Sequence, residues 1–523
     1  MTSETPVSVI THALKSPTKA DVELIEHAYT FAKKAHEGHT RYSGEPYLNH
    51  LVAVAEMLAE IGMGARTVVA GLLHDTVEDT KVTPEEIRLA FGDEITYLVE
   101  GVTKLGSVRY YGSDRHNESL RKLFVATSQD IRVLIIKLVD RLHNMKTFEH
   151  VPKDKQERIA RETLEIYVPV AHRLGMGRLR KELEDLAFPY VYPEEFKKTT
   201  EVSRQMARDA RDELEKTRKT LQKRLAESGM RTFHTSYRMK GMYSLFQKLK
   251  RREWDMGQIH DYLAIRVVVE SLEQCYQVLG IVHDLWRPMP KRMKDYIAFP
   301  KPNGYQSLHT TVITPNRIIL EVQIRTEAMN REAEYGIASH FIYKNEQVGQ
   351  KENADSSRSW FSSLIPSLFR PFSWRSKPAV ARDETGKQLL QQKNHKSKIP
   401  HWIQEIADAH KTNDGSREFF DRLKDDFFSY RIFVFTPEGD VVDLPVGASP
   451  IDFGYAIHSD IGDHTAGAKV NNKLVGLNTE LKNGDIVEIV TGKNNKPTPK
   501  WLDFTKTSLA RRRIRAALSE RES

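Results

Sequence analysis

Apolar residues in the first two hundred positions recur every three or four residues, which is the spacing of helices that bury one face. This pattern predicts helices over Asp21–Gly38, Tyr47–Ile61 and Ile131–Leu142, the first of which ends at a glycine. The apolar stretch Thr67–Leu73 is predicted to continue as a helix through the polar residues that follow it. An all-helical first domain is therefore predicted, from residue 20 to about 195.

The hydrophobic pattern changes after this domain. Glu201–Ser228 is charged with helical spacing, and it is predicted to link the first domain to a second. Tyr262–Val269 is apolar and β-branched, as in a buried strand. Thr310–Thr314 and Arg317–Arg325 are predicted to pair as strands, and in the later one polar and apolar residues alternate. A sheet with one buried and one polar face follows from this alternation.

The end of the chain is β-rich. Tyr430–Asp440 has the pattern of a strand, a turn and a strand, and Ile486–Val490 that of a closing strand. Before it, polar stretches flank an aromatic, basic and proline-containing run, Trp360–Arg375. The prolines interrupt an amphipathic helix, which favours docking on the folded domains over contact with a membrane surface. The predicted fold class is multidomain, α and α+β. The predicted parts are a helical domain at 20–195, a mixed-sheet domain with its linking helices at 196–345, a linker with helices at 346–428, a small β-rich domain at 429–492 and the start of a helical region at 493–523.

Composition narrows the class of protein. The 523 residues suffice for three or four domains, and a hydrophobic fraction of 39% supports folded cores. The single cysteine, Cys275, excludes a disulfide framework and a cysteine-rich zinc site, and it fits a cytoplasmic location. No signal sequence or membrane-spanning apolar run is recognised. The net charge of +8 agrees with phosphate-bearing partners but does not distinguish nucleotides, RNA and membranes.

Several acidic residues lie close to His74 in the sequence. Read as helix, Asp75 and Glu78 share a face with this histidine, while the neighbouring leucines are apolar. Mixed imidazole and carboxylate ligands suit Mn²⁺, Fe²⁺ or Zn²⁺ better than Ca²⁺ or Mg²⁺. The alternative is that the histidines are ordinary core residues and the acids are solvated. The candidate ligands, from three helices, are His50, His74, Asp75 and Asp140.

Other polar residues suggest what such a metal site does. Glu78 and Asp79 are placed to position or deprotonate a water molecule that the metal activates. Arg41 and Arg141 are candidates for holding phosphates. Hydrolysis of a phosphate ester is therefore one predicted reaction.

The sheet domain carries the residues expected for phosphoryl or pyrophosphoryl transfer. Asp261 and Glu321, on neighbouring strands, are candidate Mg²⁺ ligands. Tyr305 follows a glycine and offers a ring on which a base can stack. The sequence contains no Walker loop, which excludes a P-loop NTPase. Each basic residue alone is explained by solvation, but the set favours a nucleotide site: Arg238, Lys240, Lys248, Lys294 and Lys301.

The blocks Arg41–Pro46, His74–Thr80 and Asp140–Met145 closely resemble the HD-type hydrolase domain of the RelA/SpoT-homologue (Rel) family, whose long members make and degrade the alarmone (p)ppGpp. The resemblance implies Mn²⁺ on the four candidate ligands, with Glu78 and Asp79 catalysing hydrolysis. It also implies a guanosine-nucleotide site at Arg41, Ser43, Arg141, Asn144 and Thr147.

The second domain is similar to the nucleotidyltransferase-like synthetase domain of the same family. The resemblance implies that Arg238 and Arg266 stack on the adenine of ATP and that Tyr305 stacks on the acceptor guanine. Asp261 would hold Mg²⁺, and Glu321 would hold Mg²⁺ or activate the ribose 3′-hydroxyl of GDP or GTP. The other residues implied for this site are Lys240, Ser244, Lys248, Lys294, Lys301, Asn303, Gln306, His309, Gln323 and Arg325.

The β-rich module resembles a TGS domain, which in long Rel proteins senses uncharged tRNA on the ribosome. The family commonly has histidine where this chain has Asp463, and a carboxylate repels RNA. The Arg292–Asp295 block has the basic form of bifunctional members. Three functions remain: a bifunctional enzyme, a single-activity enzyme of the same architecture, and a silent nucleotide-binding regulator. The complete acid and ligand sets at both sites favour the first.

Overall fold

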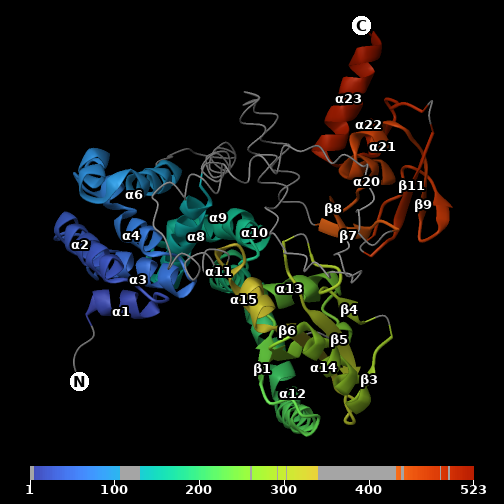
Figure 1. Ribbon diagram of the computed structural model, residues 1–523, viewed down its shortest axis with the longest axis horizontal. Helices are drawn as coiled ribbons and strands as arrows, with labels where there is room; N and C mark the ends of the chain where they lie inside the picture. The colour runs from blue at the N-terminus through green and yellow to red at the C-terminus, as the bar shows by residue number, and fades with distance from the viewer. Residues whose placement is uncertain are drawn as a thin grey trace, which may run out of the picture.

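Three folded parts are visible in the computed structural model (Figure 1): a helical domain, a mixed-sheet domain and a small β-rich domain with a terminal helix. The predicted fold class is confirmed. The predicted ligand Asp261, the linker and its run Trp360–Arg375 lie outside the described residues. The structure describes residues 5–106, 130–259, 262–290, 292–301, 303–339, 431–437, 441–482, 484–492 and 495–522.

The helical domain packs around a single core in which α4 (Ala65–Leu73) is central, because every residue of this helix except Arg66 is buried. Ile10 of α1 is also fully buried, so this core includes residues before position 20. The remaining helices around it are α1 (Pro6–Ala13), α2 (Lys19–Ala35), α3 (Tyr47–Glu60), α5 (Thr76–Asp79), α6 (Pro84–Gly106), α8 (Ile131–Lys146), α9 (Lys153–Glu162), α10 (Val168–Arg173) and α11 (Gly177–Val191).

The helix predicted to run through His74 and Glu78 is interrupted. Helix α4 ends at Leu73 and α5 begins at Thr76. The His74 ring explains part of this break, because its Nδ1 lies 2.8 Å from the carbonyl oxygen of Gly71. A side chain that bonds to the last turn competes with continuation of the helix. The interruption leaves the imidazole Nε2 directed into the protein interior.

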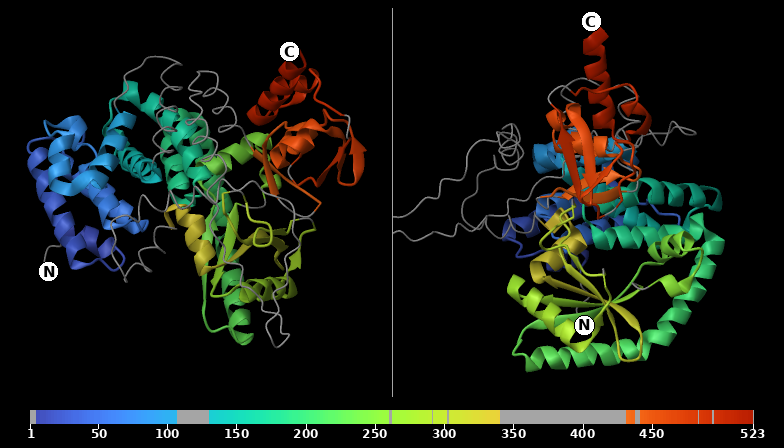
Figure 2. Two further views of the ribbon diagram at one scale, coloured as in Figure 1. Left: turned by 45° about the horizontal axis from the view of Figure 1, so that its top comes forward. Right: turned by 90° about the vertical axis from the view of Figure 1, so that its right-hand side faces the viewer.

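The mixed-sheet domain follows α12 (Pro193–Glu227), a long helix that runs beside the sheet (Figure 2). Its strand order is β1-β2-β6-β5-β3, with β4 paired to β5; β2 and β6 are parallel and the other pairs are antiparallel. The elements are β1 (Phe233–Met239), α13 (Met242–Arg251), β2 (Leu263–Val269), α14 (Leu272–Leu285), β3 (Arg287–Pro288), β4 (Lys294–Asp295), β5 (Leu308–Ile313), β6 (Ile319–Thr326) and α15 (Glu327–Tyr335).

The alternation predicted for β6 is present, but its polar face is covered. Gln323 and Arg325 are 3% and 1% exposed, because this side of the sheet meets α15 and the loops before β5. Val322 and Ile324 face the core on the other side. Charged residues on a covered face need partners, which marks this face as the place for a ligand or a polar network.

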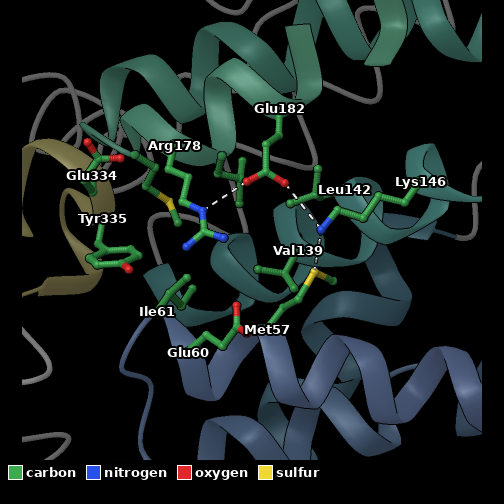
Figure 3. A pocket seen from close by; sticks show the side chains of 12 residues that line it. Met57, Glu60, Ile61, Val139, Leu142, Lys146, Arg178, Glu182, Glu334 and Tyr335 are labelled. Carbon is green, nitrogen blue, oxygen red and sulfur yellow. Dashed lines mark hydrogen bonds and ion pairs between the residues drawn. The ribbon is translucent and has the colours of Figure 1, made fainter. Parts of the chain in front are cut away.

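The chain turns from the sheet domain back onto the helical domain just after α15. The amide of Ile337 donates to the carbonyl of Leu174 over 2.9 Å, and Gly336, with φ of 57°, lies directly against this backbone. A small cavity of about 40 Å³ lies beside this joint (Figure 3). Arg178 and Lys146 are both paired with Glu182 at its wall, at 3.1 Å and 3.4 Å. The two domains therefore meet in a tight backbone contact.

Replacement of Gly336 by alanine is expected to lower the thermal unfolding midpoint of the helical domain and to loosen this joint. A Cβ at this position collides with the backbone of Leu174, Gly175 and Met176, which has no side-chain freedom to move aside. Gly229→Ala is the matched control, because Gly229 also has a positive φ but nothing within 4 Å of its Cβ position. The control is expected to lose only about 1 kcal/mol for its backbone conformation. Equal losses in the two variants would contradict the close packing.

In the small domain β7 pairs antiparallel with β8, and the second strand lies just beyond Tyr430–Asp440, the stretch predicted to contain both strands. Buried Asp452 caps α20 and also accepts hydrogen bonds from the amides of Lys506 and Thr507, which ties the terminal helices to the domain. No helix in the described part of the chain is both long and apolar enough to cross a membrane. The elements are β7 (Arg431–Phe435), β8 (Val441–Pro445), α20 (Pro450–Ile457), α21 (Ser459–Asp463), β9 (Thr465–Val470), β10 (Lys473–Val475), β11 (Val487–Thr491), α22 (Trp501–Phe504) and α23 (Ser508–Glu522).

Candidate active sites

Three helices of the first domain deliver one buried cluster. His50 comes from the first turns of α3, His74 from the end of α4 and Asp140 from the middle of α8. The Oδ1 atom of Asp140 lies 3.4 Å from His50 Nε2 and 3.6 Å from His74 Nε2. Ligand atoms of all three residues lie within 4.8 Å of one another, which is the geometry of a metal site.

Asp75 completes the set that was predicted from the sequence. Its Oδ2 atom lies 3.0 Å from His74 Nε2 and 3.6 Å from His50 Nε2. The hydroxyl of Tyr47 donates to the same oxygen over 2.7 Å. Tyr47 was not among the predicted residues, although its position one helical turn before His50 indicates that both side chains lie on the same face of the helix.

The cluster fits a metal ion on two grounds. His74 Nδ1 is engaged by a backbone carbonyl, so the buried Nε2 atom is the one directed at the carboxylates, 3.0 Å from Asp75 Oδ2. Burial opposes the charge of Asp140, but Lys137 and the two histidines outweigh it and hold the pKa of this carboxyl well below its usual range. Carboxylate oxygens and imidazole nitrogens that converge on one point are the donor set that suits a divalent transition metal.

A loop and a helix extend this cluster toward solvent. Arg41 donates to the side-chain oxygen of Asn144, whose amide nitrogen donates to Asp140 Oδ1 over 2.6 Å. Arg41 Nη1 also lies 3.1 Å from Nδ1 of His143, which is 2.8 Å from His50 Nδ1. His143, missed as a functional residue although it stands inside the Asp140–Met145 block, therefore connects the loop to a metal ligand.

The other predicted residues of this site are exposed or are bonded to groups outside the metal cluster. Glu78 and Asp79 are exposed on α5, and desolvation raises the pKa of Glu78 although Lys137 opposes the shift. Ser43 lies in the exposed loop, and the Thr147 hydroxyl bonds to carbonyls of its own helix. Arg141 is held by Glu162 at 3.5 Å and lies over the Tyr167 ring at 4.2 Å, away from the loop that carries Arg41.

A chain of hydrogen bonds crosses the polar face of the sheet. The Tyr305 hydroxyl lies 2.7 Å from His309 Nε2, and His309 Nδ1 lies 2.7 Å from Glu321 Oε1. Gln323 donates to the other Glu321 oxygen over 3.1 Å and accepts from Arg238 over 2.7 Å. Strands β5 and β6 create this arrangement, because their pairing sets His309 opposite Gln323. Both oxygens of the predicted catalytic acid are thus oriented.

Buried Arg325 and partly buried Arg266 lie beside this chain of hydrogen bonds. Arg266 Nη2 is 2.9 Å and Arg325 Nη2 is 3.6 Å from the same oxygen of Glu334 on α15. Burial lowers the pKa of both guanidinium groups, to about 10 for Arg325; the nearby Arg266 further lowers the pKa of Arg325, and Arg238 further lowers that of Arg266. Nε of both residues has no hydrogen-bond partner. Two cations that share one carboxylate leave positive charge and donors for an anionic ligand.

The remaining predicted residues lie on several elements of the domain. Lys294 on β4 pairs with His309 in the sheet register, and Asn303 donates to the carbonyl of His172 in the helical domain over 3.3 Å. Ser244 donates to Glu184 over 3.0 Å. Glu184 also accepts a hydrogen bond from Arg180, a residue that was not predicted for this site. Lys240 follows β1, Lys248 lies on α13, and Gln306 donates to the carbonyl of Ile297.

Lys301 lies over the rings of Tyr296 and Tyr305, at 4.6 Å and 4.9 Å from their centres. Burial, and then the nearby Lys294 and Arg180, lower its pKa to about 8. Binding of polyphosphate nucleotides to this site is expected to weaken about tenfold between pH 7 and pH 9, because a lysine that has lost its proton no longer attracts phosphate.

Nucleotide titrations across this pH range, with wild type and Lys301→Arg, measure the effect. Arginine keeps its charge at pH 9, so this variant is expected to bind with little dependence on pH. A wild-type affinity that does not change with pH would contradict the expected protonation of Lys301.

A helical domain with a His/Asp metal cluster, joined to a mixed-sheet domain with a basic and aromatic site, defines a two-site protein of the HD class. The chain matches the HD domain over residues 28–177, the region found in RelA / SpoT proteins over 237–348 and the TGS domain over 432–491. The chain therefore carries a RelA / SpoT region between an HD domain and a TGS domain.

The names of similar proteins include both a pyrophosphokinase and a pyrophosphohydrolase. A GTP pyrophosphokinase of Myxococcus xanthus is 41% identical over 506 residues, 96% of this chain and 61% of that protein. A guanosine-3′,5′-bis(diphosphate) 3′-pyrophosphohydrolase of Aquifex aeolicus is 41% identical over 96% of this chain and 65% of its own length. The bifunctional (p)ppGpp synthase/hydrolase SpoT of Escherichia coli is 40% identical over 95% and 65%. The chain thus spans just under two thirds of these relatives.

Proposed function

We propose that this chain is a bifunctional alarmone enzyme, both a GTP/GDP pyrophosphokinase and a (p)ppGpp 3′-pyrophosphohydrolase. One observation carries the proposal: a His/Asp cluster that could hold a metal ion and a hydrogen-bond network that orients Glu321 lie in separate domains of the same chain. The names of its relatives include both activities. A cytoplasmic location is proposed with it.

At the hydrolase site, the ion proposed is Mn²⁺, held by His50, His74, Asp75 and Asp140. It would supply an activated water and polarise a phosphoryl oxygen. Arg41, fixed by Asn144, would hold a phosphate or the guanosine of the substrate. Glu78, whose pKa is raised by desolvation, is suited to exchange a proton with water at the edge of the site.

At the synthetase site, Glu321 would take the proton of the ribose 3′-hydroxyl as this oxygen attacks the β-phosphate of ATP. His309 and Gln323 fix the carboxylate, so its orientation requires no reorganisation during the reaction. The proposed Mg²⁺ ligands are Asp261 and Glu321. Positive charge from Lys301 and the arginines would stabilise the transferred phosphates.

One pair of assays tests the proposal. Labelled ATP with GDP and Mg²⁺ is expected to yield labelled ppGpp, and labelled ppGpp with Mn²⁺ is expected to release pyrophosphate. Activity in one assay alone would establish a single-activity enzyme. Nucleotide binding without turnover in either assay would establish a silent regulator. The ribosome and uncharged tRNA remain predicted partners of the small domain, in which Asp463 accepts a hydrogen bond from Tyr455.

The two activities are expected to oppose each other, because simultaneous synthesis and hydrolysis would only consume ATP. Asn303 of the synthetase loop and Ile337 after α15 both donate to the 172–174 backbone, so the synthetase side contacts the helical domain directly. A non-hydrolysable ppGpp analogue with Mn²⁺ is expected to weaken ATP binding, by about 5-fold or more. Calorimetric titration of ATP with and without the analogue measures this coupling. Identical affinities would show that the two sites are independent.

A further inference from the structure

We propose that Lys137 is a built-in counter-charge of the metal site, which keeps the folded helical domain stable when no metal ion is bound. The proposal rests on the metal site described above but concerns a residue outside its ligand set. Lys137 acts through Asp140 and is therefore a positioning residue, not a catalytic one.

The geometry assigns the two oxygens of Asp140 to two different cations. Lys137 lies on α8, one turn before Asp140, and its Nζ atom is 2.9 Å from Oδ2. The other oxygen, Oδ1, faces the Nε2 atoms of His50 and His74 at 3.4 Å and 3.6 Å. The ammonium group thus holds Oδ2, while Oδ1, which also accepts a hydrogen bond from Asn144, faces the metal position.

Burial makes this ion pair important. The side chains of Lys137 and Asp140 are only 13% and 5% exposed, so water does little to stabilise either charge. Asp75, at 13% exposed, adds a second carboxylate to the same interior. Loss of the cation closest to a buried carboxylate is strongly destabilising, whereas a bound divalent ion provides the missing charge. Lysine and metal are therefore partly interchangeable for folding, although only the metal serves catalysis.

The test is thermal unfolding of the full chain in chelator and in Mn²⁺. Lys137→Met is expected to lower the metal-free midpoint of the helical domain by roughly 10 °C. Mn²⁺ is then expected to raise the midpoint of this variant by more than it raises that of wild type, since the ion replaces the lost charge. Lys137→Arg keeps a cation and is expected to recover most of the metal-free stability.

Arg132→Met is the matched control. Arg132 lies on the same helix, is 15% exposed, and pairs with Asp130 and Glu94 at 2.7 Å and 2.6 Å. Its removal also breaks a buried ion pair, but Mn²⁺ is expected to raise the midpoint of this variant only as much as that of wild type.

Equal Mn²⁺ shifts in Lys137→Met and Arg132→Met would overturn the proposal, because Lys137 would then be an ordinary structural lysine. An unchanged metal-free midpoint in Lys137→Met would also overturn it. If Lys137→Met does not fold without metal, the double variant Lys137→Met/Asp140→Asn, which removes both charges, is expected to fold in chelator; failure of this variant as well would contradict the charge argument. Absence of any Mn²⁺ effect on wild type would instead reject the metal site itself.

Discussion

His74→Ala and Asp140→Asn are each expected to abolish pyrophosphate release from ppGpp while leaving synthesis of ppGpp intact. Each change removes a ligand whose donor atom lies within 4.8 Å of the other ligands in the cluster. Loss of a metal that activates water removes several kcal/mol of transition-state stabilisation, which corresponds to roughly three orders of magnitude or more in rate. Separate assays of hydrolysis under Mn²⁺ and of synthesis under Mg²⁺ measure the two outcomes.

His150→Ala provides the control for loss of a histidine in the same domain, because His150 is half-exposed on a short turn after α8. Hydrolysis by this variant is expected to equal that of wild type. Bound manganese, measured on the purified proteins, should be absent from the two ligand variants and present in the control. Hydrolysis at wild-type rates by both ligand variants would show that the ligand assignment is wrong.

Glu321→Gln is expected to reduce ppGpp synthesis by roughly two or more orders of magnitude while ATP still binds. Glutamine keeps the shape of the side chain and one acceptor oxygen, but it cannot take a proton from the ribose hydroxyl. The two contacts to His309 and Gln323 currently engage both carboxylate oxygens, so the new amide group also disturbs one of them. Initial rates with labelled ATP and GDP, beside calorimetric ATP titrations, separate catalysis from binding.

Glu327→Gln is the matched control, since Glu327 is an exposed acid in the first turn of α15, one residue beyond β6. This variant is expected to synthesise ppGpp normally. Hydrolysis should be unaffected in both variants, because the metal cluster lies in the other domain. Undiminished synthesis by Glu321→Gln would remove this residue from the catalytic role and leave it as a structural partner of His309.

Much of the architecture followed from short-range pattern. Apolar residues at every third or fourth position predicted helices at Tyr47–Ile61 and Ile131–Leu142. The structure has α3 and α8 there, with the same first residues. The β-branched run at Tyr262–Val269 became β2. These predictions succeed because a side-chain period of 3.6 or 2 fixes which face is buried, whatever lies opposite.

The candidate metal ligands were predicted because several acids accompany His74, although core histidines and solvated acids explain the same spacing, and the resemblance to a known family favoured the metal site. Tyr47, Lys137 and His143 were not selected, although they orient Asp75, Asp140 and His50. A tyrosine or lysine on an amphipathic helix is ordinary, and its partner lies on another helix or one turn away. Only the packing of α3, α4 and α8 shows which of these side chains face the cluster.

The sequence by itself determined the element types, the three folded parts, and the chemical character of both candidate sites, because these depend on periodicity and residue type. Tertiary structure alone decided that the polar face of β6 is covered, that Arg266 and Arg325 share Glu334, and that Gly336 locks the sheet domain onto the helical domain. Each of these contacts joins residues from different elements. Their pairing depends on how the helices and the sheet pack in three dimensions. The spacing of residues along the chain does not specify which of them come into contact.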